Sequence, residues 1–285
     1  MFSSCCTSVV RRAERLEPPP GHGELHYCGL AGLLPLLNST RRDNDLGHPL
    51  AANLRSGDWL LDYITARLQS RSATQPLSAW FSEAFSSLRL LPRYLIPRYF
   101  DTVIVSGYTS VLQHSESLMS TFVREGSQLT RLLAQGSIIH SSEVSSAPLP
   151  PLSSKLSPPA SRHPPSLAAG LPHFSTGYMR SWGRDTFISL RGLLLVTGRF
   201  TEARDIILGY AATLRHGLIP NLLDGGKNAR YNCRDAVWWW LHAVLDFVKM
   251  TGDHGLLTAP VVRLYPTDDA EYTTNVEQPL QVSDD

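Results

Sequence analysis

Two short motifs decide the fold of this chain: Ser181-Trp182-Gly183-Arg184-Asp185 and Tyr231-Asn232-Cys233-Arg234-Asp235-Ala236-Val237-Trp238-Trp239-Trp240. Each motif places an Arg-Asp pair at the start of a strongly apolar run. Between them, residues 201–216 carry apolar side chains at i, i+3, i+4 and i+7 spacing, which predicts a helix. One helix out and one helix back returns the chain to the end where it started. Both Arg-Asp pairs are therefore expected on the same rim of a helical stack.

The residue types in these motifs suit a neutral polyol. Each Arg-Asp pair offers a forked cationic donor beside an anionic acceptor, as two adjacent sugar hydroxyls require. Trp182 and Trp238 add flat apolar faces on which a pyranose ring can stack. The competing interpretation is that each Asp caps its own helix and the neighbouring Arg bridges it at the surface.

The periodicity predicts further helices on both sides of the motifs. Asp58 is the expected N-cap of a helix that buries Trp59, Leu60, Tyr63, Ile64 and Leu68. A second run places Trp80, Phe81, Ala84, Phe85 and Leu88 on one face. Pro92 and Pro97 predict a non-helical connection over residues 93–99, followed by a long helix over 101–126. The motif region adds helices over residues 186–197, 201–216 and 235–251, with Gly198, Gly217 and Gly252 at their C-terminal ends.

Two segments have compositions that argue against packed structure. Residues 1–26 end in the Pro-rich string Glu17-Pro18-Pro19-Pro20-Gly21 and are expected to form a disordered leader. Residues 141–169 are rich in Ser and Pro, and too little apolar surface is expected there to order the segment. We expect a surface loop at 141–169 whose deletion changes thermal stability little.

Composition excludes several function classes. The formal net charge is +1, so no electrostatic footprint for nucleic acid or an anionic membrane is visible. No apolar run approaches the roughly 18 residues of a membrane-spanning helix. The four cysteines, Cys5, Cys6, Cys28 and Cys233, follow neither a metal-binding nor a disulfide spacing, which is typical of a reducing, cytoplasmic compartment.

Long irregular strings throughout the chain resemble the C-terminal glucosidase region of the eukaryotic glycogen debranching enzymes. They run from about Tyr27 to Leu280, and the most specific are Asn53-Leu54-Arg55-Ser56-Gly57-Asp58-Trp59, Leu214-Arg215-His216-Gly217-Leu218-Ile219-Pro220-Asn221 and the two motifs above. The resemblance implies an all-α fold, a partial (α/α)6 toroid in which this chain supplies about six of the twelve helices of a glucoamylase-like barrel. Residues 27–140 and 170–285 then belong to the glucosidase domain, on either side of the loop at 141–169.

The resemblance also implies an activity, hydrolysis of α-1,6-linked glucose at branch points of glycogen or a limit dextrin, without metal or cofactor. An inverting mechanism needs a carboxylic acid and a carboxylate base about 6.5–9.5 Å apart. Both carboxylates are expected downstream of this chain. No catalytic residue is therefore assigned, and the chain alone is expected to be inactive. Two alternatives are a non-catalytic glucan-binding module and a helical scaffold for a protein partner. The substrate-binding residues implied by the resemblance are Trp182, Arg184, Asp185, Arg234 and Asp235, with Arg215, His216, Asn221 and Trp238 as weaker candidates.

Two of the weaker assignments, His216 and Trp238, have competing interpretations. His216 suits the C-terminal end of a helix as well as a ligand role. Trp238 shares a stripe with Val237 and Leu241, which favours a core position. Asp268 and Asp269 follow Tyr265-Pro266-Thr267 and look like part of a turn.

Overall fold

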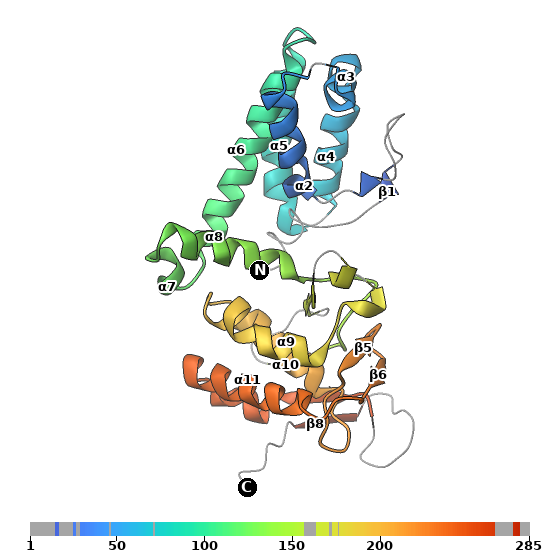
Figure 1. Ribbon diagram of the computed structural model, residues 1–285, viewed down its shortest axis with the longest axis vertical. Coiled ribbons are helices and arrows are strands. Elements are labelled where there is room, and N and C mark those ends of the chain that lie inside the picture. Colours follow the sequence, from blue (N-terminus) through green and yellow to red (C-terminus); the bar gives the residue numbers. More distant parts are fainter. Residues whose placement is uncertain are drawn as a thin grey trace. The chain divides into compact units, whose positions relative to one another are not determined.

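The computed structural model describes residues 15–16, 25–26, 29–45, 47–70, 72–156, 164–170, 173–175, 177–265 and 276–279. Over these residues the chain is mainly helical, as the sequence predicts (Figure 1). It falls into two compact units, Met1–Leu118 (unit 1) and Met119–Asp285 (unit 2), and each is described by itself. The toroid stays a prediction.

Unit 1 is built from amphipathic helices around an aromatic core. Phe81, Phe85 and Phe100 are fully buried, and their ring centroids follow one another at 5.3 and 6.0 Å. Of the expected leader, only Arg15–Leu16 (β1) and Leu25–His26 (β2) are described, and they pair as an antiparallel ladder. The helices are α2 (Gly29–Arg42), α3 (Pro49–Ser56), α4 (Trp59–Gln69), the 3-10 turn η1 (Ser72–Thr74), α5 (Gln75–Arg89) and α6 (Ile96–Ser117).

Helix α4 follows Asp58 as expected, but its buried face is different from the predicted one. Leu61, Ile64 and Leu68 point into the core, whereas Trp59 is 56% exposed and stacks on Tyr63 with ring centroids 5.1 Å apart. The i, i+3, i+7 spacing of the aliphatic residues fixes the inward stripe, and Trp59 lies on the opposite side of the helix. Trp80 of α5 is likewise 42% exposed, beside buried Phe81.

The predicted long helix begins earlier and ends earlier than expected. Helix α6 starts at Ile96, with Pro97 in its first turn, and stops at Ser117. Pro is tolerated there because the first helical N–H groups have no intrahelical acceptor. The predicted non-helical connection over 93–99 is therefore confirmed only for residues 93–95, and the predicted helix over 101–126 only as far as Ser117.

Unit 2 holds the motifs. In chain order its elements are α7 (Thr121–Arg124), α8 (Gln128–Ser137), η2 (Ile138–His140), β3 (Ser141–Ser142), β4 (Ser166–Leu167), η3 (His173–Ser175), η4 (Gly177–Met179), α9 (Gly183–Leu190), the π-helical turn η5 (Arg191–Leu195), α10 (Phe200–Ala211), β5 (Leu222–Asp224), β6 (Asn228–Arg230), α11 (Ala236–Thr251), η6 (His254–Thr258), β7 (Pro260–Arg263) and β8 (Val276–Pro279). The strands pair in sequence as three antiparallel two-stranded ladders. Strands of two to four residues are too short for periodicity to reveal, so the all-α prediction omitted them.

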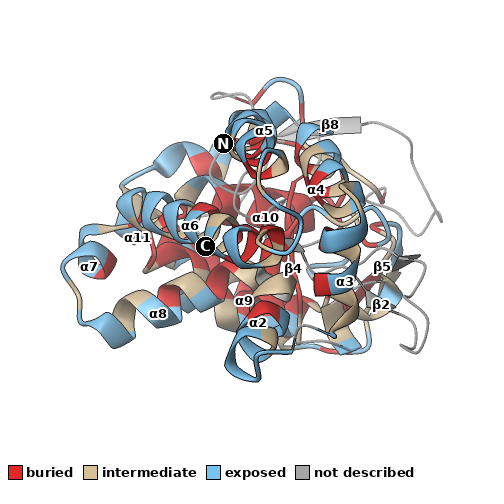
Figure 2. Cartoon of the chain, turned by 90° about the horizontal axis from the view of Figure 1, so that it is seen from above, coloured by how far each residue is buried: buried red, intermediate tan, exposed pale blue. Residues whose placement is uncertain are grey.

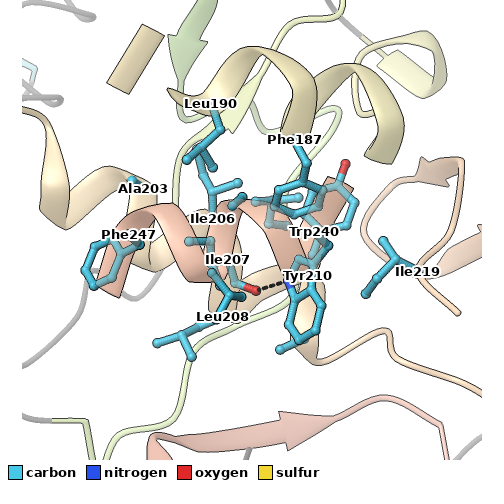
Figure 3. Close-up of a cluster of buried hydrophobic side chains, with 14 of the residues drawn as sticks. Phe187, Leu190, Ala203, Ile206, Ile207, Leu208, Tyr210, Ile219, Trp240 and Phe247 are labelled. Atoms are coloured by element: carbon cyan, nitrogen blue, oxygen red, sulfur yellow. Dashed lines mark hydrogen bonds between the residues drawn. The ribbon is translucent and has the colours of Figure 1, made fainter. Parts of the chain in front are cut away.

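The core of unit 2 is organised around α10. Every residue from Glu202 to Ala211 is buried, and Figure 2 shows α10 largely in the buried colour. Figure 3 shows Phe187 and Leu190 of α9 and Trp240 and Phe247 of α11 in one cluster with the apolar side chains of α10. A helix that is buried all round is held by its neighbours rather than by its own amphipathicity.

The helix ends differ in detail from the predicted ones. Gly198 and Gly252 have φ of 82° and 71°, the left-handed conformation expected where a helix ends. Gly217 also has a positive φ, 71°, but α10 has already ended at Ala211, so Gly217 does not terminate it.

The segment 140–169 is here called the strap, and its described residues, 140–156 and 164–169, are packed and not loose. Leu149, Leu156 and Leu167 are each at most 4% exposed and join the core cluster of unit 2. The strap begins and ends in the β3–β4 ladder, where Ser141 pairs with Leu167. The Ser and Pro residues that dominate the segment drew attention away from a few well-spaced apolar residues, so the expectation that the segment buries little apolar surface is wrong. Residues 157–163 lie outside the described part of the strap.

Candidate carbohydrate-binding site

Helices α9 and α11 run side by side in the same direction (Figure 1). Arg184, in the first turn of α9, is 2.8 Å from Asp235 at the start of α11, measured from Nη2 to Oδ1. Further along both helices, Arg191 Nε lies 3.8 Å from Asp246 Oδ2. Two contacts in the same order on both helices mean that the N-termini lie at the same end. The two Arg-Asp motifs are thus brought to one rim.

The ion pair joins one motif to the other. Arg184 Nε and Nη2 donate to Asp235 Oδ1 at 3.1 and 2.8 Å, and Nη2 also reaches Cys233 Sγ at 2.8 Å. The Cys233 thiol itself donates to Asp235 Oδ1. Hydrogen bonds from Arg184 and then Cys233 lower the pKa of Asp235 to about 2. Asp235 sits at the N-cap of α11 without a side-chain capping bond, so helix capping does not explain it.

A backbone ladder fixes the first motif. Gly183 N donates to Asn221 O at 2.8 Å, and Leu223 N donates to Ser181 O at 2.9 Å. A Cβ on Gly183 would lie 2.2 Å from Pro220 O, so only glycine allows this approach. The turn before α9 is therefore set by the strand that leads to the second motif.

Trp182, Trp238 and Trp240 differ in how far they are buried. Trp182 is half-buried; its Nε1 donates to Met179 O at 2.7 Å, and its ring meets the edge of Phe174. Trp238 is 67% exposed, so the interpretation of Trp238 as a core residue is wrong. Trp240 fills the core instead: it is 2% exposed, and its Nε1 donates to Ile207 O at 3.2 Å (Figure 3). The neighbours in α11 face different sides because successive helical residues differ by about 100°.

Arg215 and His216 lie in a tight turn rather than at a helix end. Arg215 and Leu218 exchange backbone hydrogen bonds of 3.1 and 2.8 Å, and His216 has a φ of 48°. Positive φ at both central residues, His216 and Gly217, is typical of a type I′ turn. His216 is exposed, and the alternative that it terminates a helix is wrong. Arg215 stacks over the ring of Tyr265, 5.4 Å from its centroid.

The remaining candidates differ in accessibility. Asp185 and Arg234 are exposed near the same helix ends. Asn221 is half-buried, and no described residue bonds its Oδ1. Asp268 and Asp269 lie outside the described residues. Among the residues that the structure describes, no group of three or more His, Cys, Asp and Glu side chains could hold a metal ion, and no helix is long and apolar enough to cross a membrane.

Sequence reasoning missed two side chains at this site. Cys233 contacts both members of the ion pair, although its spacing to the other cysteines carries no signal. Arg180 is fully buried directly before the first motif. Because arginine is seldom fully buried, only the position of Arg180 next to Ser181 could have indicated its role.

Comparisons with known proteins give the family of the chain. A family model described as amylo-alpha-1,6-glucosidase matches residues 134–278, just over half of the chain, and another described as the central domain of human glycogen debranching enzyme matches residues 19–68. The second match covers residues 19–26 of the expected leader and residues 27–68, whose assignment to the glucosidase domain stays a prediction. The glycogen debranching enzyme of Saccharomyces cerevisiae is 44% identical over 254 residues, which make up 88% of this chain and 16% of the yeast protein. The chain belongs to the amylo-alpha-1,6-glucosidase family of glycogen debranching enzymes.

Proposed function

We propose that unit 2 binds the α-1,6-linked terminal glucose of a glycogen branch or limit dextrin, as part of an amylo-α-1,6-glucosidase site. The observation that carries this proposal is the pairing of Arg184 with Asp235 where α9 and α11 begin. Trp238 is exposed about one turn further along α11. An ion pair beside an exposed indole matches both the hydroxyls and the apolar face of a sugar ring.

The ion pair leaves a donor and an acceptor for a ligand. Arg184 gives Nε and Nη2 to its protein partners, and no described residue accepts from Nη1. Asp235 receives these bonds on Oδ1, and no other side chain among the described residues donates to Oδ2. Adjacent hydroxyls of a glucose can accept from Nη1 and donate to Oδ2.

The charge of Asp235 favours binding over catalysis. With a pKa of about 2, its carboxylate stays ionised near neutral pH and remains a hydrogen-bond acceptor. A general acid must instead hold a proton until the leaving oxygen takes it. Asp235 therefore orients the sugar, and other carboxylates of the debranching enzyme supply the acid and the base.

The order of the helices supports a wider proposal, that α9, α10 and α11 form part of an (α/α)6 toroid. In such a fold, inner helices alternate with outer ones and direct their N-termini at the sugar. Here α9 and α11 share a direction, and α10 connects them in sequence. The family relationship supports a cytoplasmic protein that acts on glycogen.

The test is calorimetric titration with panose, in which an α-1,6-linked glucose is attached to maltose, and with maltotriose as the linkage control. We expect tighter binding of panose, weakened about tenfold or more by Arg184→Lys, because lysine lacks the fork. Arg191→Lys, which alters the other inter-helix ion pair, is the matched control and should bind like the unchanged protein. Absence of panose binding, or binding that Arg184→Lys leaves intact, contradicts the proposal.

A glucose-release assay on limit dextrin separates the remaining functions. Binding without release is the result expected of this chain, either as part of a glucosidase site or as a glucan-binding module. Release well above that of an Asp185→Asn, Asp235→Asn double variant shows that the chain is catalytic by itself. A protein that shows neither property is a helical scaffold.

A further inference from the structure

Arg180 is a fully buried charge immediately before the first motif. Its guanidinium donates to Ser166 Oγ at 2.8 Å from Nε, to Ser175 O at 2.7 Å from Nη1 and to Ser142 Oγ at 2.9 Å from Nη2. Nη2 also reaches the carbonyl oxygens of His140 and Ser166. Burying a charge is costly unless its donors are satisfied, so an arrangement with this many acceptors is specific to arginine.

The acceptors come from both ends of the strap. Ser142 belongs to β3 and Ser166 to β4, so one side chain ties the two strands of that ladder. The backbone adds to this tie: Ala168 N donates to His140 O at 2.8 Å, and Ala169 N donates to Arg180 O at 3.1 Å. The strap is thus fastened to the main chain at Arg180 as well as to its side chain.

The backbone that follows Arg180 is also held by hydrogen bonds, and it leads directly into the proposed sugar site. Ser181 and Gly183 are held by the strand that begins at Leu222, and Arg184 is the next residue. A shift of the backbone at 180 would therefore move the base from which Arg184 reaches Asp235.

We propose that Arg180 is a positioning residue for the proposed glucan site: it fastens the strap to the backbone before Ser181 and thereby sets the Arg184–Asp235 geometry. Arg180 does not touch the sugar and acts through Arg184. The inference rests on the proposed function only for the identity of the ligand, because the geometry that it concerns exists without ligand.

The first measurement needs no ligand. The carboxyl carbon of Asp235 is followed by NMR against pH in the unchanged protein and in Arg180→Lys, which keeps the charge but loses the fork. An arginine partner lowers a carboxyl pKa by about 1–3 units, so displacement of Arg184 should raise the Asp235 midpoint by about one unit. Arg199→Lys is the matched control: Arg199 is also buried in unit 2 but pairs with Glu202. This control should lower Tm and leave the Asp235 midpoint in place.

The second measurement is panose affinity. Arg180→Lys should weaken it about tenfold, and the loss should largely disappear in an Asp235→Asn background, since residues that act through one contact are not additive. Suppose that Arg180→Lys lowers Tm but that the titration midpoint of Asp235 is the same in Arg180→Lys as in Arg199→Lys. Arg180 is then only structural, and the inference is wrong. If Arg180→Lys does not fold, Ser142→Ala with Ser166→Ala removes two acceptors and must raise the same midpoint. Failure of the unchanged protein to bind panose contradicts the proposed function alone, because the NMR titration still judges Arg180.

Discussion

Gly226 and Pro148 approach so closely that a Cβ on Gly226 would lie 2.5 Å from the Pro148 carbonyl oxygen. Gly226 is at the tip of the β5–β6 hairpin, and Pro148 belongs to the strap. The hairpin that connects the two motifs therefore rests directly on a segment whose composition suggested a loose loop.

We expect Gly226→Ala to destabilise unit 2 by about 1–3 kcal/mol, through strain at its φ of 73° and the clash with Pro148. Gly225→Ala is the control, because Gly225 also has a positive φ, 58°, but no atom near its missing Cβ. Urea unfolding of both variants measures the difference. Equal losses would show that the contact with the strap contributes nothing.

We expect Leu149→Ala to lower the free energy of unfolding by about 2–5 kcal/mol, because Leu149 is 4% exposed and belongs to the core cluster. Lys155→Ala, at an exposed position of the same strap, should change it by less than about 0.5 kcal/mol. Thermal and urea unfolding check both values. A Leu149 variant as stable as the unchanged protein would restore the view of the strap as a dispensable loop.

Two of the three tryptophans of α11, Trp238 and Trp240, should separate stability from binding. Trp240→Ala removes a buried side chain and should cost about 3–5 kcal/mol. Trp238→Ala removes an exposed one, so stability should stay within about 0.5 kcal/mol while panose binding weakens. Unfolding curves and calorimetric titration measure the two effects. A large stability loss in Trp238→Ala would contradict its exposed position.

Asp235 should make unfolding depend on pH in the acid range. Its folded pKa of about 2 lies below the usual value of about 3.9, so the ionised form favours folding. This contribution is fully present above about pH 4 and is lost as the pH falls toward 2. Asp235→Asn should therefore differ from the unchanged protein in stability at pH 5 more than at pH 2, and the difference should shrink in high salt because the pair is exposed. The control Glu143→Gln removes a charge from another exposed side chain of unit 2, and an identical pH profile in both variants would contradict the assignment.

The amino-acid sequence alone predicts the helices of the motif region and the common end at which the two motifs lie. The apolar spacing of residues 201–216 indicated one helix between the motifs, and helical connectivity alone then placed Arg184 and Asp235 on the same rim. Local periodicity suffices to indicate this helix, although α10 is buried on all sides and not along one stripe alone. The family followed from irregular strings such as Ser181 to Asp185, which periodicity does not explain.

Which side chains meet depends on the packing of segments that are distant in the sequence. Sequence spacing paired Arg184 with its neighbour Asp185, whereas the packing of α9 against α11 pairs it with Asp235 and Cys233. Trp238 and Trp240 have the same chemistry, but only Trp240 joins the core cluster, where its Nε1 donates to Ile207 O of α10. Both ends of the strap likewise supply hydrogen-bond acceptors to the buried Arg180, and Ser142 and Ser166 lie far from it in sequence. Contacts between distant segments depend both on the burial of apolar side chains and on the hydrogen bonds that buried polar groups can form. A local pattern of residues encodes neither of these two factors.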